Sequence, residues 1–138
     1  MGKLNKGQKK TYRIQKDAMA EFGYELKFTM RGSHVLNDSV AVWFPRLTDS
    51  IEDIRVRGFG NLKIKDGDFL IEIAADDRKL NNVLNSISRN RIVFSKYKNE
   101  DYCFEGLYKY DSVDKTSRKV TWKRIAAEID TKEYPSEK

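Results

Sequence analysis

Residues 91–129 read RIVFSKYKNEDYCFEGLYKYDSVDKTSRKVTWKRIAAEI, and the fold class is inferred mainly from this segment. It holds three runs of β-branched and aromatic residues, separated by polar turns at residues 98–101 and 111–116. Such runs favour strands, and turns this short join antiparallel neighbours. The stretch therefore predicts three consecutive strands of one antiparallel sheet.

Aromatic side chains alternate along the second of these strands. Tyr102, Phe104, Tyr108 and Tyr110 share one parity, and residues two apart point to the same face of a strand. We expect Phe104 to lie in the core. Tyr108 and Tyr110, with Trp122 on the third strand, are candidates for stacking on nucleic-acid bases. For Trp122, burial in the core is the alternative.

Basic residues surround Trp122 on the third strand. No acid stands between residues 115 and 124, and exposed cations bind phosphates in a salt-dependent way. The candidates for contact with a nucleic-acid backbone in this stretch are Lys115, Arg118, Lys119, Lys123 and Arg124.

A second candidate site reads RVRGFGN over residues 55–61. We expect a strand over residues 51–57, which would place Arg55 and Arg57 on one face. The glycines that follow allow the backbone to approach a phosphate. Phe59, held between two glycines, is a candidate to fill the gap that a base leaves when it flips out of the stack. An ordinary turn between two strands is the alternative.

The remaining pattern predicts two helices. One is expected over residues 11–22, with Thr11 as its N-cap and Gly23 as its C-terminal stop. The second begins at Asp76 or Asp77 and carries apolar residues at positions 80, 83, 84 and 87, which is helical spacing.

Short strands are expected over residues 24–30, 40–44, 62–65 and 69–73, with a polar loop over residues 31–39 and a hairpin turn at Asp66-Gly67. The predicted fold class is α+β: a mostly antiparallel sheet, curled or closed into a small barrel, with two helices.

The net charge of +6 originates in the N-terminal segment. Residues 1–16 carry six basic residues and no acid, and the rest of the chain is balanced. We expect residues 1–10 to form a flexible basic arm that either raises affinity for polyanions or only solubilises the protein. Residues 11–130 are expected to form a single barrel-like domain, and residues 131–138 a disordered tail.

Composition also limits where the protein acts. No apolar run approaches the length of a membrane span, and the N-terminus lacks the apolar segment of a secretory signal. A single cysteine, Cys103, fits a reducing cytoplasm, and with one histidine it does not provide a zinc site. We expect a cytoplasmic protein with no membrane partner, no metal and no cofactor.

Three acids lie close together in the sequence at Asp66, Asp68 and Glu72. Metal-dependent nucleases need two or three carboxylates around an ion. However, Glu72-Ile73-Ala74 lacks the lysine of the Glu-x-Lys signature, and Asp66 is explained by its turn. A nuclease is therefore the third hypothesis, and no catalytic residue is predicted.

Residues 102–126 read YCFEGLYKYDSVDKTSRKVTWKRIA. This strand with an aromatic-x-Gly-Leu-Tyr core, followed by a loop and a basic strand, resembles PUA-like barrels. More narrowly, it is similar to the SRA-like reader domains of modification-dependent restriction endonucleases, which are often found beside an HNH nuclease. The resemblance implies a barrel that cups an extruded base in a pocket and grips the flanking phosphates with basic loops. It implies no nuclease in this chain, so cleavage would come from a partner.

The leading hypothesis is thus a non-enzymatic nucleic-acid-binding module that recognises a modified or flipped base, in DNA rather than RNA. A partner nuclease would belong to the same restriction-modification setting. The alternative is a small interaction factor, of phage or mobile-element type, that binds a host protein through tyrosine and arginine residues, which are also enriched at protein interfaces.

Overall fold

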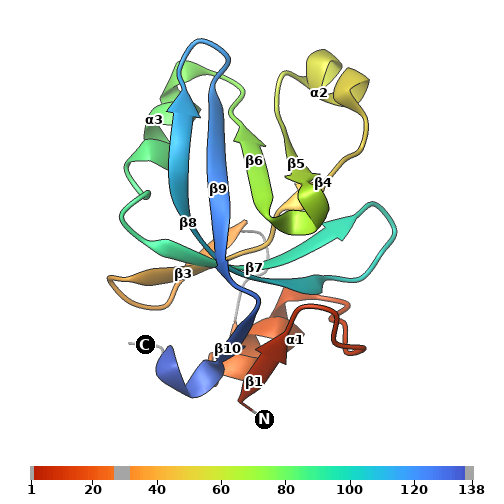
Figure 1. Cartoon of the computed structure of the whole chain (residues 1–138), viewed down its shortest axis with the longest axis vertical. Helices are drawn as coiled ribbons and strands as arrows, with labels where there is room; N and C mark the ends of the chain where they lie inside the picture. The colour runs from red at the N-terminus through yellow and green to blue at the C-terminus, as the bar shows by residue number, and fades with distance from the viewer. Residues whose placement is uncertain (1, 27–31, 136–138) are drawn as a thin grey trace.

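Six strands close into a small barrel in the computed structural model, which describes residues 2–26 and 32–135 (Figure 1). The order around the barrel is β7, β4, β5, β6, β9 and β8, and β8 pairs back with β7. The strands are β4 (Arg46–Leu47), β5 (Gly60–Ile64), β6 (Phe69–Ile73), β7 (Asn90–Tyr97), β8 (Cys103–Asp114) and β9 (Lys119–Ala126). The prediction of an α+β small barrel is confirmed.

Two strands extend the barrel sheet beyond β7. These are β3 (Val40–Trp43), which runs parallel to β7, and β2 (Ser33–Val35), which is antiparallel to β3. A polar loop was expected where β2 lies, and that expectation is wrong. The strand expected over residues 40–44 is confirmed as β3, which ends at Trp43.

The C-terminal stretch forms the three consecutive antiparallel strands that its pattern predicts. Strand β8 is longer than expected, because it continues to Asp114 through the residues expected to turn. A register shift falls where Val93 pairs with Gly106 and Phe94 pairs with Phe104, so that Glu105 is the extra residue of a β-bulge. A bulge reverses the inward and outward alternation beyond it. Phe104 therefore packs in one core, with Tyr102 just before the strand, whereas Tyr108 and Tyr110 pack in the other.

The first predicted helix is shorter than expected. Helix α1 spans Gln15–Met19 and continues as the 3-10 turn η1 (Ala20–Phe22), and Gly23 ends it in the left-handed conformation, as predicted. The N-cap residue is Ile14 rather than Thr11, whose hydroxyl donates instead to Asp101.

The second predicted helix is confirmed as α3 (Asp77–Leu84), with the Asp76 carboxylate accepting from the backbone N–H of Lys79. Residues 51–57 form a third helix, α2 (Ile51–Arg57), and not the expected strand. The Ser50 hydroxyl caps α2 and Gly58 ends it in the left-handed conformation.

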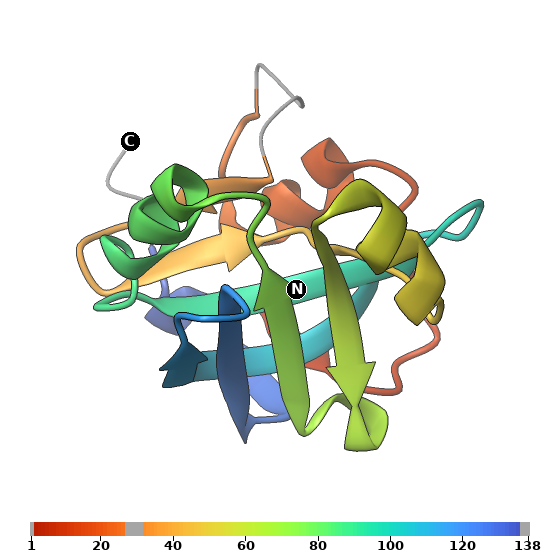
Figure 2. The same cartoon turned by 90° about the horizontal axis from the view of Figure 1, so that it is seen from above.

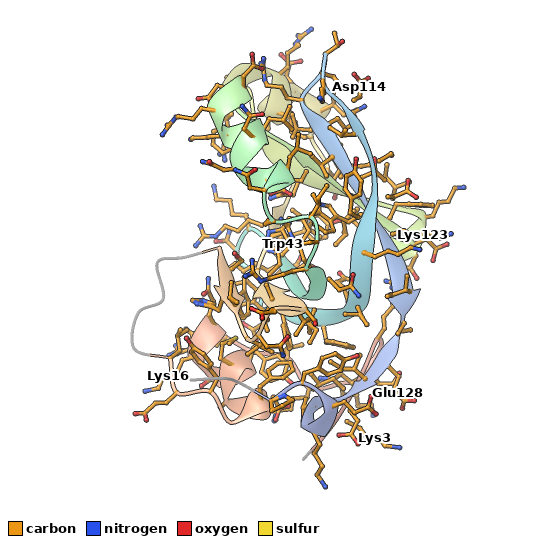
Figure 3. All side chains as sticks on the ribbon, turned by 90° about the vertical axis from the view of Figure 1, so that its left-hand side faces the viewer. Lys3, Lys16, Trp43, Asp114, Lys123 and Glu128 are labelled. Atoms are coloured by element: carbon orange, nitrogen blue, oxygen red, sulfur yellow. The ribbon has the colours of Figure 1, made fainter. Side chains whose placement is uncertain are left out.

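Two hydrophobic cores share the wall made by β7. Ile92 and Phe94 point into the first core, with side chains of β1, α1 and η1, whereas Val93 points into the second, inside the barrel. Figure 3 shows Trp43, a residue of the second core, in the centre of the molecule. Val83 and Leu84 of helix α3, together with Ile87 in the turn that follows it, pack against the second core.

The N-terminal segment is part of the fold. Strand β1 (Lys3–Asn5) pairs with β10 (Glu128–Asp130), Leu4 is buried, and the ammonium of Lys6 lies 2.6 Å from the Asp66 carboxylate. The structure therefore contradicts a free arm at these positions. At the other end, the 3-10 turn η3 (Thr131–Glu133) lies in the expected tail, and residues 136–138 lie outside the described part.

The strand expected over residues 24–30 is not found where it can be checked. Residues 24–26 carry no strand, and residues 27–30 lie outside the described part of the chain. No helix among the described residues has the length and apolar character to cross a membrane.

Candidate nucleic-acid interface

A pocket of about 300 Å³ opens between the ends of β5 and β6 and helix α3. In Figure 2, α2 and α3 flank the ends of these two strands. The volume is at the lower end of the range for small-molecule sites. The lining residues are Phe59, Gly60, Asn61, Glu72, Ile73, Ala74, Ala75, Lys79, Asn82 and Val83.

The Glu72 carboxylate is the acid of this pocket, and the barrel interior holds it in place. One of its oxygens, Oε1, accepts from Nη1 of Arg91 at 3.0 Å and from the indole N–H of Trp122 at 3.2 Å. The Arg91 guanidinium in turn lies over the rings of Trp122 and Trp43, 3.7 and 4.5 Å from their centroids. Burial lowers the pKa of Arg91, and the attraction of Glu72 opposes that shift. The pocket is thus lined by a residue, Glu72, whose carboxylate is oriented by a buried cation.

Phe59 stands at the rim of the pocket with 48% of its surface exposed. Gly58 before it has φ +82°, a left-handed conformation that favours glycine. Gly60 after it lies against Ile54 of α2, so closely that a Cβ there would come within 2.8 Å of that side chain. The two glycines therefore hold the short loop in place while the phenyl ring faces solvent.

Several predicted cations gather near the same rim. The Arg118 side chain donates to the backbone oxygen of Ala74, a lining residue, at 3.2 Å. Lys119 is directly across the sheet from Ile73, another lining residue, and Lys115 lies exposed in the adjoining β8–β9 turn. Lys79, which the sequence reasoning did not single out, lines the pocket itself.

Arg55 and Arg57 lie on α2 rather than on a strand. Residues two apart on a helix do not share a face, so the expected pair of parallel arginines does not form. Nη2 of Arg55 instead donates to both carboxylate oxygens of Glu52, at 2.7 and 2.9 Å. Arg57 is exposed next to Gly58, close in sequence to the rim.

The structure contradicts a stacking role for two of the three predicted aromatic residues. Tyr108 and Trp122 are fully buried, and neither offers a ring face to a ligand. The Tyr108 hydroxyl donates to the backbone oxygen of Gly67 at 2.5 Å, and burial raises its pKa. Tyr110 is partly buried, with its ring edge-to-face on Trp122. Burial of Phe104, expected from the sequence, is confirmed.

Arg124 and Lys123 lie toward the other end of β9, away from the pocket rim. The Arg124 side chain is nearly buried and donates to the backbone oxygens of Glu105 and Asp66. Its predicted contact with a nucleic-acid backbone is therefore replaced by a structural role. Lys123 points away from the barrel into solvent (Figure 3).

Glu105, the bulge residue, is the centre of this second charged cluster. Its carboxylate accepts from the Ser95 hydroxyl at 2.5 Å and from the Lys63 ammonium at 2.9 Å. Burial alone would lower the pKa of Lys63, but the hydrogen bond and charge of Glu105 outweigh it, and the pKa is raised. The cluster ties β5, β7, β8 and β9 together inside the barrel.

The three acids of the nuclease hypothesis do not converge. Glu72 points into the barrel toward Arg91, whereas Asp66 pairs with Lys6 and Asp68 with Arg124. Across residues 2–26 and 32–135, no group of three or more His, Cys, Asp or Glu side chains is arranged to hold a metal ion.

Glu72 is the pocket residue whose setting the sequence reasoning missed. A signal was present in the sequence, because Glu72 alternates with Leu70 and Ala74 along a strand, and both of these are buried in the barrel core. A charged residue on the inward face of a strand requires a partner. That partner, Arg91, was passed over as the first residue of an apolar strand.

Comparisons with known proteins agree with the barrel. A family model described as the SET and RING associated domain, abbreviated SRA, matches residues 2–131. Among solved structures, the chain is similar to the 5-hydroxymethylcytosine-specific restriction enzyme AbaSI, with a TM-score of 0.75 and 26% sequence identity. The similarity covers 94% of this chain and 42% of that chain, so this chain spans less than half of that enzyme. Among curated proteins, no sequence matches.

Proposed function

The chain belongs to the SRA family, as the resemblance of residues 102–126 predicted, and from this premise we propose that it binds DNA and reads a modified base flipped out of the duplex. The observation that carries the proposal is the pocket at the end of the barrel, with the Glu72 carboxylate in its lining. A base that leaves its stack needs a pocket that hydrogen-bonds its pairing edge.

Glu72 favours a base with an exocyclic amine. A carboxylate accepts from the amino group of cytosine, and a base that presents a carbonyl oxygen at that position would face it with repulsion. Arg91 and Trp122 both donate to Oε1, and this fixes the orientation of the carboxylate. Asn61, in the same lining, offers a further donor and acceptor. The enzyme AbaSI is described as specific for 5-hydroxymethylcytosine. We propose that this chain likewise binds a modified cytosine.

The rim supplies the remaining contacts in this proposal. The exposed ring of Phe59 fills the space that the base leaves, because an apolar side chain inserted between base steps offsets part of the cost of unstacking. Arg57, Lys115, Arg118 and Lys119 contact phosphates on either side, which adds a salt-dependent contribution to affinity.

Binding to short duplexes tests the proposal. Fluorescence anisotropy would compare DNA with one central 5-hydroxymethylcytosine, cytosine or 5-hydroxymethyluracil, and an RNA duplex. We expect the modified cytosine to bind about 5- to 100-fold more tightly than the uracil analogue, which lacks the amine. Equal affinity for cytosine and 5-hydroxymethylcytosine would exclude a modification reader, and no binding to any duplex at low salt would exclude the whole proposal.

Variants locate the reading residue. Glu72→Gln is expected to remove the preference for an amine, because an amide can donate as well as accept. Glu52→Gln, an exposed acid on α2, is the matched control and should leave the preference intact. Asn61→Leu, a lining residue without an ion pair, tests the pocket independently if Glu72→Gln disturbs the fold. Melting temperatures report the fold of each variant.

A partner that supplies cleavage is part of the same proposal. Helix α2 exposes Ile51 and Val56, with 72% and 78% of their surface accessible, beside the pocket rim. Exposed apolar groups of this kind are typical of protein–protein contacts. They therefore also support the alternative hypothesis of a small interaction factor that binds another protein. The purified chain is expected to leave modified DNA uncut in the presence of Mg²⁺. Cleavage by the chain alone, lost in a Glu72→Gln variant, would contradict this expectation.

A further inference from the structure

A row of lysines crosses the outer wall of the barrel at the end of β9 away from the pocket. Lys109 of β8 and Lys123 of β9 are directly opposite each other, and Phe69 of β6 pairs with Lys123 on its other side. The ammonium of Lys65 lies 5.9 Å from the centre of the Phe69 ring. We call Lys65, Phe69, Lys109 and Lys123 the wall patch. Its three lysines are exposed, and Figure 3 shows Lys123 pointing outward.

The wall patch carries uncompensated positive charge. Like charges directly opposite on neighbouring strands repel each other. Among the described residues, none of the three lysines has a carboxylate within ion-pair distance. The acids nearest to Lys65 in sequence are engaged elsewhere, because Asp66 pairs with Lys6 and Asp68 with Arg124. A polyanion that bound here would relieve the repulsion.

The length of β9 gives the distance between the pocket and the wall patch. Strand β9 runs from Lys119, opposite the lining residue Ile73, to Lys123. Four residues of an antiparallel strand rise by about 13 Å. One strand of a DNA duplex carries a phosphate about every 3.4 Å along the helix axis, so that this distance corresponds to roughly four nucleotides.

We propose that the wall patch binds the phosphate backbone of the duplex about four nucleotides from the base held in the pocket. The inference rests on the proposed function for its register, since the distance is counted along β9 from Lys119, beside the pocket proposed to hold the base. The contact is independent of sequence and modification, because it involves phosphates alone. It therefore contributes affinity and orientation, while the pocket provides discrimination.

Charge reversal tests the wall patch. The double variant Lys109→Glu/Lys123→Glu is compared with Lys3→Glu/Lys16→Glu, which makes the same charge change at two exposed lysines near the N-terminus (Figure 3). For a duplex of about 20 base pairs, the wall variant is expected to lower the slope of log affinity against log salt by about 2, at roughly 0.9 per lost phosphate contact. The control variant should keep the wild-type slope.

Two further experiments distinguish failure of this inference from failure of the proposed function. A duplex that extends only about three base pairs from the modified base should bind the wall variant and the wild type alike. The ratio of affinities for modified and unmodified DNA should not change in the wall variant, whereas Glu72→Gln changes that ratio and not the salt slope. If the wild-type protein binds modified and unmodified DNA equally, the proposed function of the pocket is contradicted. In that case the salt slope of the wall variant still tests the wall patch.

An unchanged salt slope in a correctly folded wall variant would overturn the inference and leave an acidic protein surface as the remaining partner. Equal losses in the wall and control variants would overturn it too, because they would reflect net charge alone. Lys109→Gln/Lys123→Gln serves as the milder variant if charge reversal impairs folding. Melting curves establish the folded state of each variant.

Discussion

The guanidinium carbon of Arg91 lies 3.7 Å from the centre of the Trp122 ring, inside the barrel and directly behind the pocket acid. The same guanidinium donates to Glu72, so one buried cation supports an aromatic ring and a carboxylate together. A cation in contact with an aromatic face and removed from water interacts with it more strongly than at an exposed site. This arrangement makes the barrel interior part of the candidate site.

Removing the Arg91 charge should destabilise the protein strongly. Arg91→Met leaves Glu72 without its partner, and breaking a buried ion pair from one side costs about 3–5 kcal/mol of unfolding free energy. The double variant Arg91→Met/Glu72→Leu should recover most of this loss, because replacing both partners with apolar groups is often neutral. Urea unfolding measures both variants. A double variant as unstable as Arg91→Met would show that the ring contact, and not the ion pair, dominates.

A similar loss of stability is expected at the β8 bulge, where Glu105 is the centre of the second charged cluster. Glu105→Gln leaves the Lys63 ammonium and Arg124 facing a neutral amide, and we expect a loss of about 3 kcal/mol in unfolding free energy. Glu128→Gln, an exposed acid on β10, is the control and should stay within about 0.5 kcal/mol of wild type. A small effect at Glu105 would mean that the bulge does not depend on its charge.

Position 67 requires glycine, both because of its backbone conformation and because neighbouring side chains leave no room for a Cβ. It has φ +93°, and a Cβ there would overlap Nη2 of Arg124 and lie 3.1 Å from the Glu105 carboxylate. Gly67→Ala is expected to cost about 3 kcal/mol, combining strain of the left-handed conformation with overpacking. Gly23→Ala has φ +70° but no atom within 4 Å, so it should cost only about 1 kcal/mol. Thermal unfolding of the two variants separates the contributions.

The buried phenol of Tyr108 predicts a loss of stability in alkaline solution. Burial raises its pKa above the ordinary value of 10.0, so the folded protein keeps a proton that the unfolded chain releases. The stabilisation is complete below pH 10 and declines as the pH rises toward the folded pKa. Tyr108→Phe should show a shallower decline above pH 10, although it loses about 1 kcal/mol from the missing hydrogen bond to Gly67.

Chemical unfolding at pH values from about 8 to 11 measures the slope. An unchanged slope in Tyr108→Phe would assign the alkaline loss to another group, of which Tyr12 is the first candidate because burial also raises its pKa.

Leu4 tests whether the N-terminal segment belongs to the fold. Its side chain is 2% exposed in the first core, and Leu4→Ala should lower the unfolding free energy by about 2–4 kcal/mol. Lys3→Ala, an exposed neighbour on the same strand, should have little effect. Wild-type stability in Leu4→Ala would restore the expectation of a flexible arm.

Local patterns account for the elements that sequence reasoning predicted correctly. Helix α3 has its apolar residues at helical spacing and an aspartate cap, and both signals lie within twelve residues of each other. The C-terminal strands and the sharp turn at Asp66-Gly67 could be predicted for the same reason. Strand propensity and left-handed turn residues act over short distances along the chain.

Helix α2 was missed although its local signals were present. Ser50 caps it and Gly58 ends it, but only Ile54 of its three apolar residues is buried. Without an apolar face, the segment has no helical periodicity, and the alternation of Arg55, Val56 and Arg57 favours a strand instead. Capping residues would have been the better evidence here.

The barrel class, the C-terminal meander and the cluster of basic residues between positions 115 and 124 could be predicted from the sequence, because these depend on periodicity and composition. The fold, and not the local pattern, decides which aromatic residues are accessible, because the bulge at Glu105 places Tyr108 on the opposite face of β8 from Phe104. It also decided the candidate site. Glu72 and Arg91 are 19 residues apart in the chain, and only closure of the barrel brings them together under the pocket.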